Sequence, residues 1–332
     1  MPDEQGRLTL DERDTFERLG NIFMPLAASK ALVKWPKRDG VARFVHYTSA
    51  DAALKIITSK RIWMRNTVCM TDFREVSHGY DLLITNKRKL HELRAVLDEC
   101  LPNAATDGID AFDRLFPAIR ANTYVTSISE HEDSEDAFGR LSMWRAFGNQ
   151  PSARVAIVFN IPWYSEATRA LGIIFSPIAY LSGDGVREEL DRVISNVRES
   201  AAYLKQLPTQ FVTGTLYGML LSAVTCLKHP GFHEEREWRA IYNPQLPGAS
   251  AEVLVSIESV GGVPQLVHSL QLDALACPIA ADLDFPKIFD RLIIGPSQYA
   301  EPMRHAFNTA LGTAGVDEPW KRVVLSDIPI RS

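Results

Sequence analysis

The chain has 332 residues, of which 46% are hydrophobic and 23% charged, as in ordinary folded proteins. Its net charge of −5 at pH 7 argues against nucleic acid as a partner, because binding phosphates requires a surplus of basic side chains. Four cysteines without a Cys-x-x-Cys pair give no support to a zinc ribbon or a thioredoxin-type site. The acidic start has no apolar segment of a signal peptide, so we expect a cytoplasmic protein with reduced thiols.

The sequence pattern of the first part of the chain predicts two helical segments separated by a short strand. Residues 9–34 have the amphipathic pattern of a helical leader, which ends near Pro36. A short strand is predicted over residues 43–47. Thr48, with Asp51 three residues later, has the spacing of a capping box, so we expect Thr48 to cap a helix that follows it directly.

Further along, elements of both kinds alternate. The run at residues 154–161 is almost continuously apolar, which is typical of a strand buried on both faces. The apolar helix at 211–227 contains glycines and hydroxyl side chains and is short for a membrane span, so we expect it inside the fold and expect no membrane partner. A loop rich in glycine and valine is predicted between residues 242 and 291. The other predicted helices cover residues 75–100, 110–120, 136–147, 186–206 and 299–312, and the other predicted strands cover residues 61–64, 123–129, 235–242, 291–294 and 322–325.

This mixture of elements predicts an α+β fold. No linker rich in proline, glycine or serine divides the sequence. We therefore expect an N-terminal helical leader over residues 1–40, followed by a single domain over residues 41–332 with a helical insertion near residues 186–228.

Several segments, in this order and spacing, resemble one known family. They are FVHYTS at residues 44–49, MTDFREVSHG at 70–79, TSIS at 126–129, MWRAFG at 143–148 and KHPGFHEEREWRAIY at 228–242. The chain is thereby identified as a member of the bacterial domain of unknown function 2971 family, over residues 40–330, and LIIGPSQ and SDIPIR near the end fit as well. Two positions depart from the family pattern, Thr71 and Ile128, and neither removes an acidic or hydroxyl group. The family name implies no activity.

A looser likeness concerns ADP-ribosyltransferases of the His-Tyr-Glu and Arg-Ser-Glu types. The chain has His46-Tyr47, then Ser127-x-Ser129, then Glu235-x-Glu237, in the order of those enzymes. The likeness implies a split β-sheet with helical insertions. It also implies NAD as a substrate, an unknown macromolecular acceptor and no permanently bound cofactor.

The chemistry of NAD cleavage suggests a role for each of these residues. Breaking the bond between nicotinamide and ribose builds positive charge on the sugar, which a carboxylate stabilises. On an extended strand, Glu235, Glu237 and Arg239 share one face, with the two carboxylates about 7 Å apart. We assign Glu237 to the cationic sugar, Glu235 to the acceptor, and His46, before a helix N-terminus, to a ribose hydroxyl or a phosphate. The expected NAD-binding residues are His46, Tyr47, Thr48, Ser127, Ser129 and Arg239.

Structural interpretations of the same residues remain open. Arg239 could pair with a glutamate on a solvated strand face, and His46 could be a core histidine. A metal site is not expected, although two groups of residues have suitable side chains: Asp72 with Glu75 and His78, and His229 with His233 and Glu237. The sequence leaves three functions: an ADP-ribosyltransferase-like enzyme, a non-catalytic nucleotide-sensing or protein-interaction module, and a metal-dependent hydrolase or nuclease.

Overall fold

The computed structural model describes residues 10–37, 39–69, 75–146, 153–163, 166–246 and 248–329. The chain forms two compact units, each assembled from three segments. Unit 1 consists of Met1–Lys34, Asn66–Thr123 and Ser176–His233, and unit 2 consists of Trp35–Arg65, Tyr124–Phe175 and Glu234–Ser332. Unit 1 therefore contains residues 1–34 of the predicted helical leader and the whole of the predicted helical insertion.

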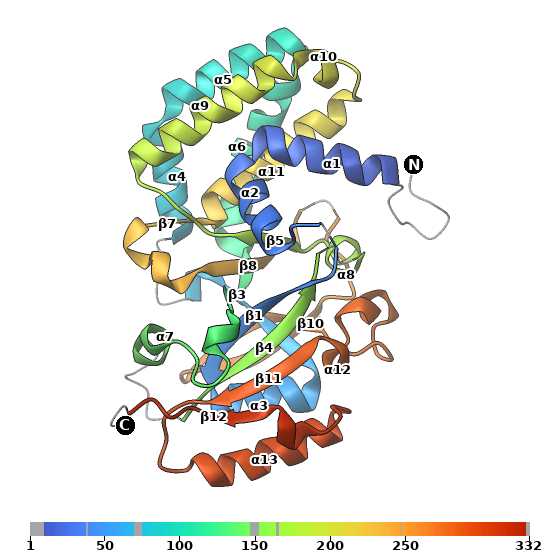
Figure 1. The fold of residues 1–332 in the computed structure, drawn as a ribbon. Helices are drawn as coiled ribbons and strands as arrows, with labels where there is room; N and C mark the ends of the chain where they lie inside the picture. Colours follow the sequence, from blue (N-terminus) through green and yellow to red (C-terminus); the bar gives the residue numbers. More distant parts are fainter. Residues whose placement is uncertain are drawn as a thin grey trace. The chain divides into compact units, whose positions relative to one another are not determined.

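Unit 1 is built mainly of helices (Figure 1). In α9, apolar side chains recur every three or four residues, and this stripe is buried. The same helix begins at Ser182, whose hydroxyl accepts a hydrogen bond from the Gly185 N–H and so caps the first turn. The helices are α1 (Leu10–Phe23), α2 (Pro25–Lys34), α4 (Glu75–Thr85), α5 (Lys87–Cys100), α6 (Ala104–Asn122), α9 (Gly183–Glu199), α10 (Ala201–Leu204) and α11 (Thr209–Thr225). Unit 1 also contains a short parallel pair of strands, β6 (Ala179–Tyr180) and β7 (Leu227–Lys228).

Helices α4 and α11 approach each other at Gly79. A Cβ atom at this position would lie 2.6 Å from the carbonyl oxygen of Ala223 and 2.8 Å from the Cα atom of Val224. Only glycine leaves room for such close backbone contact. The helix predicted over 211–227 is confirmed as α11. Among the described residues, no helix is both long and apolar enough to cross a membrane.

Unit 2 contains a large mixed β-sheet, so the predicted α+β class is confirmed. Ten strands within the described residues form this sheet, in the order β12-β11-β4-β1-β3-β2-β10-β9, and β8 pairs with β3 and β5. Strands β11 and β12 are parallel, with the helix α13 between them in sequence. The strands are β1 (Val41–Ser49), β2 (Arg61–Asn66), β3 (Tyr124–Glu130), β4 (Arg154–Pro162), β5 (Ile174–Pro177), β8 (Glu237–Tyr242), β9 (Leu254–Val260), β10 (Val263–Gln271), β11 (Phe289–Ile294) and β12 (Val323–Leu325).

The core of unit 2 lies on both faces of this sheet. Strand β4 confirms the predicted buried strand, because residues 155–159 are all at most 2% exposed. Its odd-numbered residues, such as Ile157, belong to the larger apolar cluster, and its even-numbered residues, such as Val158, pack with Trp144. The helices of this unit are α3 (Ala50–Ser59), α7 (Leu141–Ala146), α8 (Glu166–Ala170), α12 (Phe285–Ile288) and α13 (Ala300–Thr313).

Trp144 is held between two glycines. Its side chain is buried, its Nε1 donates to the Phe138 carbonyl at 2.8 Å, and its ring meets the Tyr47 ring edge-on at 4.9 Å. A Cβ atom at Gly139 would come within 2.8 Å of the indole, and one at Gly295 within 3.0 Å. The MWRAFG and LIIGPSQ motifs therefore meet in one packing arrangement.

The helix after β1 has a different cap from the predicted one. Thr48 is still part of β1, where it is in register with Val155. Ser49 is the N-cap of α3, and its hydroxyl accepts a hydrogen bond from the Ala52 N–H at 3.2 Å. The prediction of Thr48 was wrong by one residue because β-ladder pairing continues to the end of the strand.

The predicted loop before residue 291 contains a β-hairpin. Strands β9 and β10 pair in antiparallel register around Gly261 and Gly262, whose φ angles are 59° and 81°. Positive φ at both central residues is the geometry that a tight two-residue hairpin turn requires, and glycine adopts it without strain. The loop prediction is therefore wrong here, because the two glycines form the tight turn of a hairpin and the valines beside them belong to its strands.

Candidate functional site

The three strands that carry the predicted site residues are neighbours in the sheet. Val45 of β1 is in register with Ser129 of β3, and Ser129 is in register with Glu237 of β8. The strands carrying His46, Ser127 and Glu237 therefore lie side by side, although they are far apart in the sequence.

His46 and Glu237 nevertheless point to opposite faces of the sheet. Residues in register on antiparallel strands share a face, so Val45, Ser129 and Glu237 lie on one side. His46 follows Val45 and faces the other side, where its register partner Ile157 belongs to the main apolar cluster. The structure therefore does not bring His46 and Glu237 into one pocket on the same face.

The imidazole of His46 has a structural partner. Its Nδ1 lies 2.9 Å from the Ser127 carbonyl oxygen and carries the proton of that hydrogen bond, since a carbonyl only accepts. Burial lowers the pKa of His46, although the hydrogen bond to the Ser127 carbonyl acts in the opposite direction. His46 is therefore neutral at pH 7, and this partly buried side chain makes the backbone hydrogen bond of a structural histidine.

Glu237 and Arg239 form a buried ion pair. They are 6% and 1% exposed, and the Arg239 Nε donates to the Glu237 Oε1 at 2.7 Å. A second guanidinium nitrogen donates to Oε2 at 3.3 Å. The Ser127 hydroxyl donates to Oε1 from the neighbouring strand. The predicted shared face of residues 237 and 239 is confirmed, and the carboxylate is engaged by a guanidinium and a hydroxyl.

Glu235 does not belong to this strand. It ends a 3₁₀ helix at Pro230–Glu235, and β8 begins at Glu237. Between them, Arg236 has a φ of 44°, in the left-handed region, and its guanidinium meets Glu132 at 3.1 Å and Glu135 at 2.5 Å. The prediction of two carboxylates about 7 Å apart on one strand face is therefore wrong, because the chain turns at Arg236.

Three other expected NAD-binding residues, Tyr47, Thr48 and Ser129, lie in β-strands and contact other parts of the protein. The Tyr47 hydroxyl accepts a hydrogen bond from the Arg140 N–H at 2.7 Å, and burial raises the pKa of Tyr47 to about 12. Thr48 takes part in the β1–β4 ladder. Ser129 is buried on the face that carries Glu237. None of these contacts assigns a ligand.

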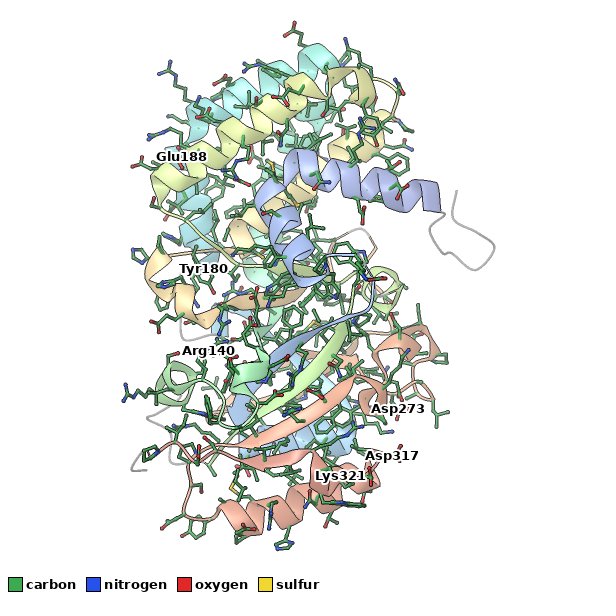
Figure 2. The ribbon with its side chains drawn as sticks, viewed as in Figure 1. Arg140, Tyr180, Glu188, Asp273, Asp317 and Lys321 are labelled. Carbon is green, nitrogen blue, oxygen red and sulfur yellow. The ribbon has the colours of Figure 1, made fainter. Side chains whose placement is uncertain are left out.

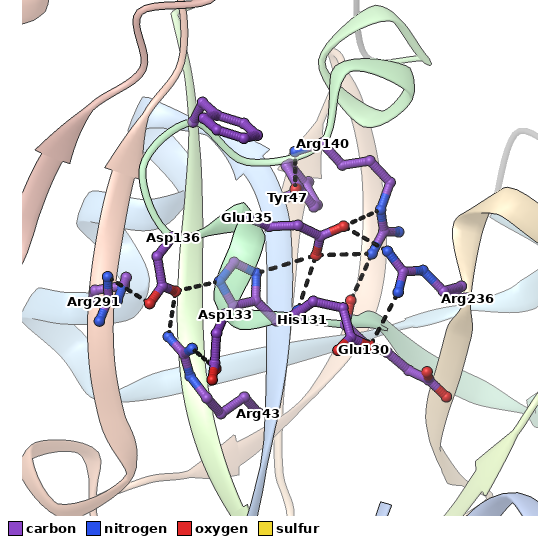
Figure 3. A network of polar contacts seen from close by, with 12 residues as sticks. Arg43, Tyr47, Glu130, His131, Asp133, Glu135, Asp136, Arg140, Arg236 and Arg291 are labelled. Carbon is purple, nitrogen blue, oxygen red and sulfur yellow. Dashed lines mark hydrogen bonds and ion pairs between the residues drawn. The ribbon is translucent and has the colours of Figure 1, made fainter.

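Sequence reasoning missed a dense polar network on unit 2 (Figure 3). Arg43 contacts Asp133 at 2.7 Å and Asp136 at 2.6 Å, and it also pairs with Asp290. The His131 Nε2 lies 2.9 Å from Asp136. The dense acidic run at residues 130–136 was the available signal, but its partners come from distant parts of the chain.

Two further arginines complete this network at Glu135. The Arg140 Nε donates to Glu135 at 2.9 Å, and Arg236 reaches the same carboxylate. Burial would raise the pKa of Glu135, but the Arg140 guanidinium keeps it below its usual value. Burial lowers the pKa of His131. Paired charges of this kind hold the loop after β3 in place, and a structural ion-pair network shifts pKa values as these are shifted.

No metal site is evident in the described part of the chain, where no group of three or more histidine, cysteine or acidic residues could hold an ion. Asp72 and the Glu75 side chain lie outside the described residues, so the predicted alternative there stays a prediction. His229 and His233 make local contacts: the His229 Nδ1 accepts from the Gly231 N–H, and the His233 Nδ1 bonds to the Pro230 carbonyl.

Comparison with known protein families gives one match. Residues 143–240 match the model of the family described as protein of unknown function (DUF2971). The predicted resemblance, expected over residues 40–330, is thus confirmed over this segment. The DUF2971 segment runs from α7 into β8 and includes Trp144, Glu237 and Arg239. No curated protein and no solved structure matches the chain, and nothing in these comparisons supports the likeness to ADP-ribosyltransferases.

Proposed function

We propose that the chain is a cytoplasmic protein-interaction module that has no transferase activity. The observation that carries this proposal is the engagement of Glu237, the expected catalytic acid, in a buried pair with Arg239. A carboxylate that stabilises a cationic sugar has to face the substrate. The carboxylate of Glu237 instead faces a guanidinium, with which it shares two hydrogen bonds.

The surface that supports an interaction role is the β9–β10 hairpin. Val255, Ile257 and Leu266 are 60%, 75% and 51% exposed. Ile257 and Leu266 are in register, so they share one face. Of the strands that the structure describes, β9 pairs with β10 alone and ends the strand order. An apolar face on such an edge is a docking surface for another strand.

A second copy of the chain fits this edge. If two β9 strands pair antiparallel about Ile257, this residue opposes itself and Ser256 opposes Glu258 of the other copy. Ser256 already donates to Glu258 within one strand at 3.0 Å, so the two side chains are complementary. The two copies of Glu258 do not oppose each other. Because the pairing is twofold symmetric, the same edge serves both partners.

We expect Ile257→Lys to weaken self-association at least tenfold, because a charged side chain would replace the central apolar contact. Sedimentation velocity over a concentration series measures the association. Val263→Lys is the matched control, since Val263 is 57% exposed on the other face of the same hairpin and should leave association unchanged. A wild-type chain that stays monomeric throughout, or an Ile257→Lys variant that dimerises normally, would overturn the proposal.

The second candidate is an NAD-cleaving, ADP-ribosyltransferase-like enzyme with a split sheet. The observation in its favour is the Ser127 hydroxyl that donates to Glu237. Strand β3 pairs with both β1 and β2, and its register with β1 covers only Phe44–Glu130 and Val45–Ser129. In this candidate, Ser127 and Arg239 orient the Glu237 carboxylate toward the ribose, and the acceptor is an unidentified macromolecule.

For this candidate, Glu237→Gln should reduce nicotinamide release from NAD by about 100- to 10,000-fold, because it removes the charge and keeps the shape. Release is measured with water as the acceptor and with added protein acceptors. Glu301→Gln, a change of the same kind on the exposed surface of α13, is the control. If the wild-type chain releases no nicotinamide under either condition, the enzyme candidate fails and the interaction module stands.

A further inference from the structure

Unit 1 contains a cavity with an apolar wall. The cavity has a volume of about 100 Å³ and opens partly to solvent. Its wall comes from the end of α1, from α2, α4, α9 and α11, and from the segments around β6 and β7, all within unit 1. The wall includes Phe23, Ala27, Ile178, Leu190, Val193 and Met219. An engineered apolar cavity of about 150 Å³ stays dry and accepts a benzene molecule, so a space of this size and lining suits a small hydrocarbon group.

The charged groups on this wall are already engaged by the protein. The Lys30 Nζ donates to the Ile178 carbonyl at 2.7 Å and lies 5.2 Å from the centre of the Tyr180 ring, which is labelled in Figure 2. The Glu189 carboxylate accepts hydrogen bonds from the Leu26 N–H at 2.8 Å and from Arg192 at 2.6 Å. The two charges are opposite, so the wall offers no net charge to a ligand.

We propose that this cavity binds a neutral ligand with a short hydrocarbon chain. The apolar wall favours the chain because burying it removes apolar surface from water. A single uncharged polar group can remain at the side that opens to solvent. A carboxylate or an ammonium group held there would lose part of its hydration, and the wall has no free counter-charge to compensate, so charged analogues should bind more weakly.

The cavity is independent of the interaction surface proposed above. Val255, Ile257 and Leu266 belong to unit 2, whereas every residue of the cavity wall belongs to unit 1. Loss of self-association and loss of ligand binding are therefore separate outcomes, and either proposal can fail alone.

The test uses 1-hexanol as the probe, with hexanoate and hexylammonium as charged analogues. We expect 1-hexanol to shift the NMR signal of the Met219 methyl group and to raise the Tm, with both charged analogues at least tenfold weaker. Ala27→Leu fills the wall from α2 and should weaken hexanol binding at least tenfold. Ala28→Leu, on the same helix but outside the wall, should bind as the wild type does.

Circular dichroism establishes that both variants keep their helices. The proposal is overturned if the Met219 methyl signal does not respond to saturating hexanol, or if folded Ala27→Leu binds as tightly as Ala28→Leu. Equal binding of hexanol and hexanoate also contradicts it, because it would show that the site does not select for a neutral ligand.

Discussion

Replacement of Arg239 by Met is expected to lower the free energy of unfolding by about 3–5 kcal/mol, because it removes the guanidinium that pairs with the buried Glu237 carboxylate. Arg239 is 1% exposed and Glu237 is 6% exposed, so water replaces little of the lost interaction. The hydrogen bond from Ser127 remains, but a hydroxyl does not neutralise the charge. Urea unfolding at neutral pH measures the loss.

The double variant Glu237→Gln, Arg239→Met is the control for this prediction. Removing both charges leaves no buried carboxylate that needs the Arg239 guanidinium, so the double variant should recover most of the stability that Arg239→Met loses. If Arg239→Met costs less than about 1 kcal/mol, as surface ion pairs typically do, the pair has no important structural role. That result would strengthen the enzyme candidate, because Glu237 would then be available for other contacts.

The second large effect is expected at Gly79. Gly79→Ala should destabilise unit 1 by about 1–3 kcal/mol or more, because the added methyl group meets the backbone of Ala223 and Val224. A backbone cannot move aside as a flexible side chain does, so α4 and α11 would have to separate. The variant tests whether this glycine in the MTDFREVSHG motif serves packing.

Gly218→Ala supplies a matched control on α11. Gly218 is also within a helix, but a Cβ atom there meets nothing within 4 Å. Alanine should therefore stabilise the helix by about 0.5–1 kcal/mol, through its higher helix propensity. Urea unfolding should give opposite signs for the two variants. Shifts in the same direction would show that the close approach at Gly79 does not decide stability.

Local patterns predicted most of the helices and strands. The apolar run at 154–161 identified β4, and the order of strand, helix and strand near the end identified β11, α13 and β12. The failures are also local in origin. Thr48 and Ser49 are both good caps, and only the β1–β4 ladder decides which one ends the strand. The hairpin at Gly261 was missed because glycine and valine together were interpreted as a loop.

The candidate site was only partly predictable. A spacing of two residues places Glu237 and Arg239 on one face of a strand, and the structure agrees. Whether His46 lies on the same face as Glu237 and Arg239 depends on the register of β1 against β3 and of β3 against β8. No local sequence pattern contains that register. The polar network was invisible for the same reason, since Arg43 and Asp290 are 247 residues apart in sequence.

The interleaved course of the chain has a consequence during synthesis. All three segments of unit 1 have been made once residue 233 is complete, whereas unit 2 still lacks its last segment. Strands β8 and β11, the partners of β3 and β4, belong to that segment. At about 5–20 residues per second, a ribosome needs roughly 5–20 s to supply it. During this interval the apolar strand β4 lacks its neighbour β11. Nascent chains should therefore be most prone to aggregation and chaperone binding after unit 1 is complete and before unit 2 is complete.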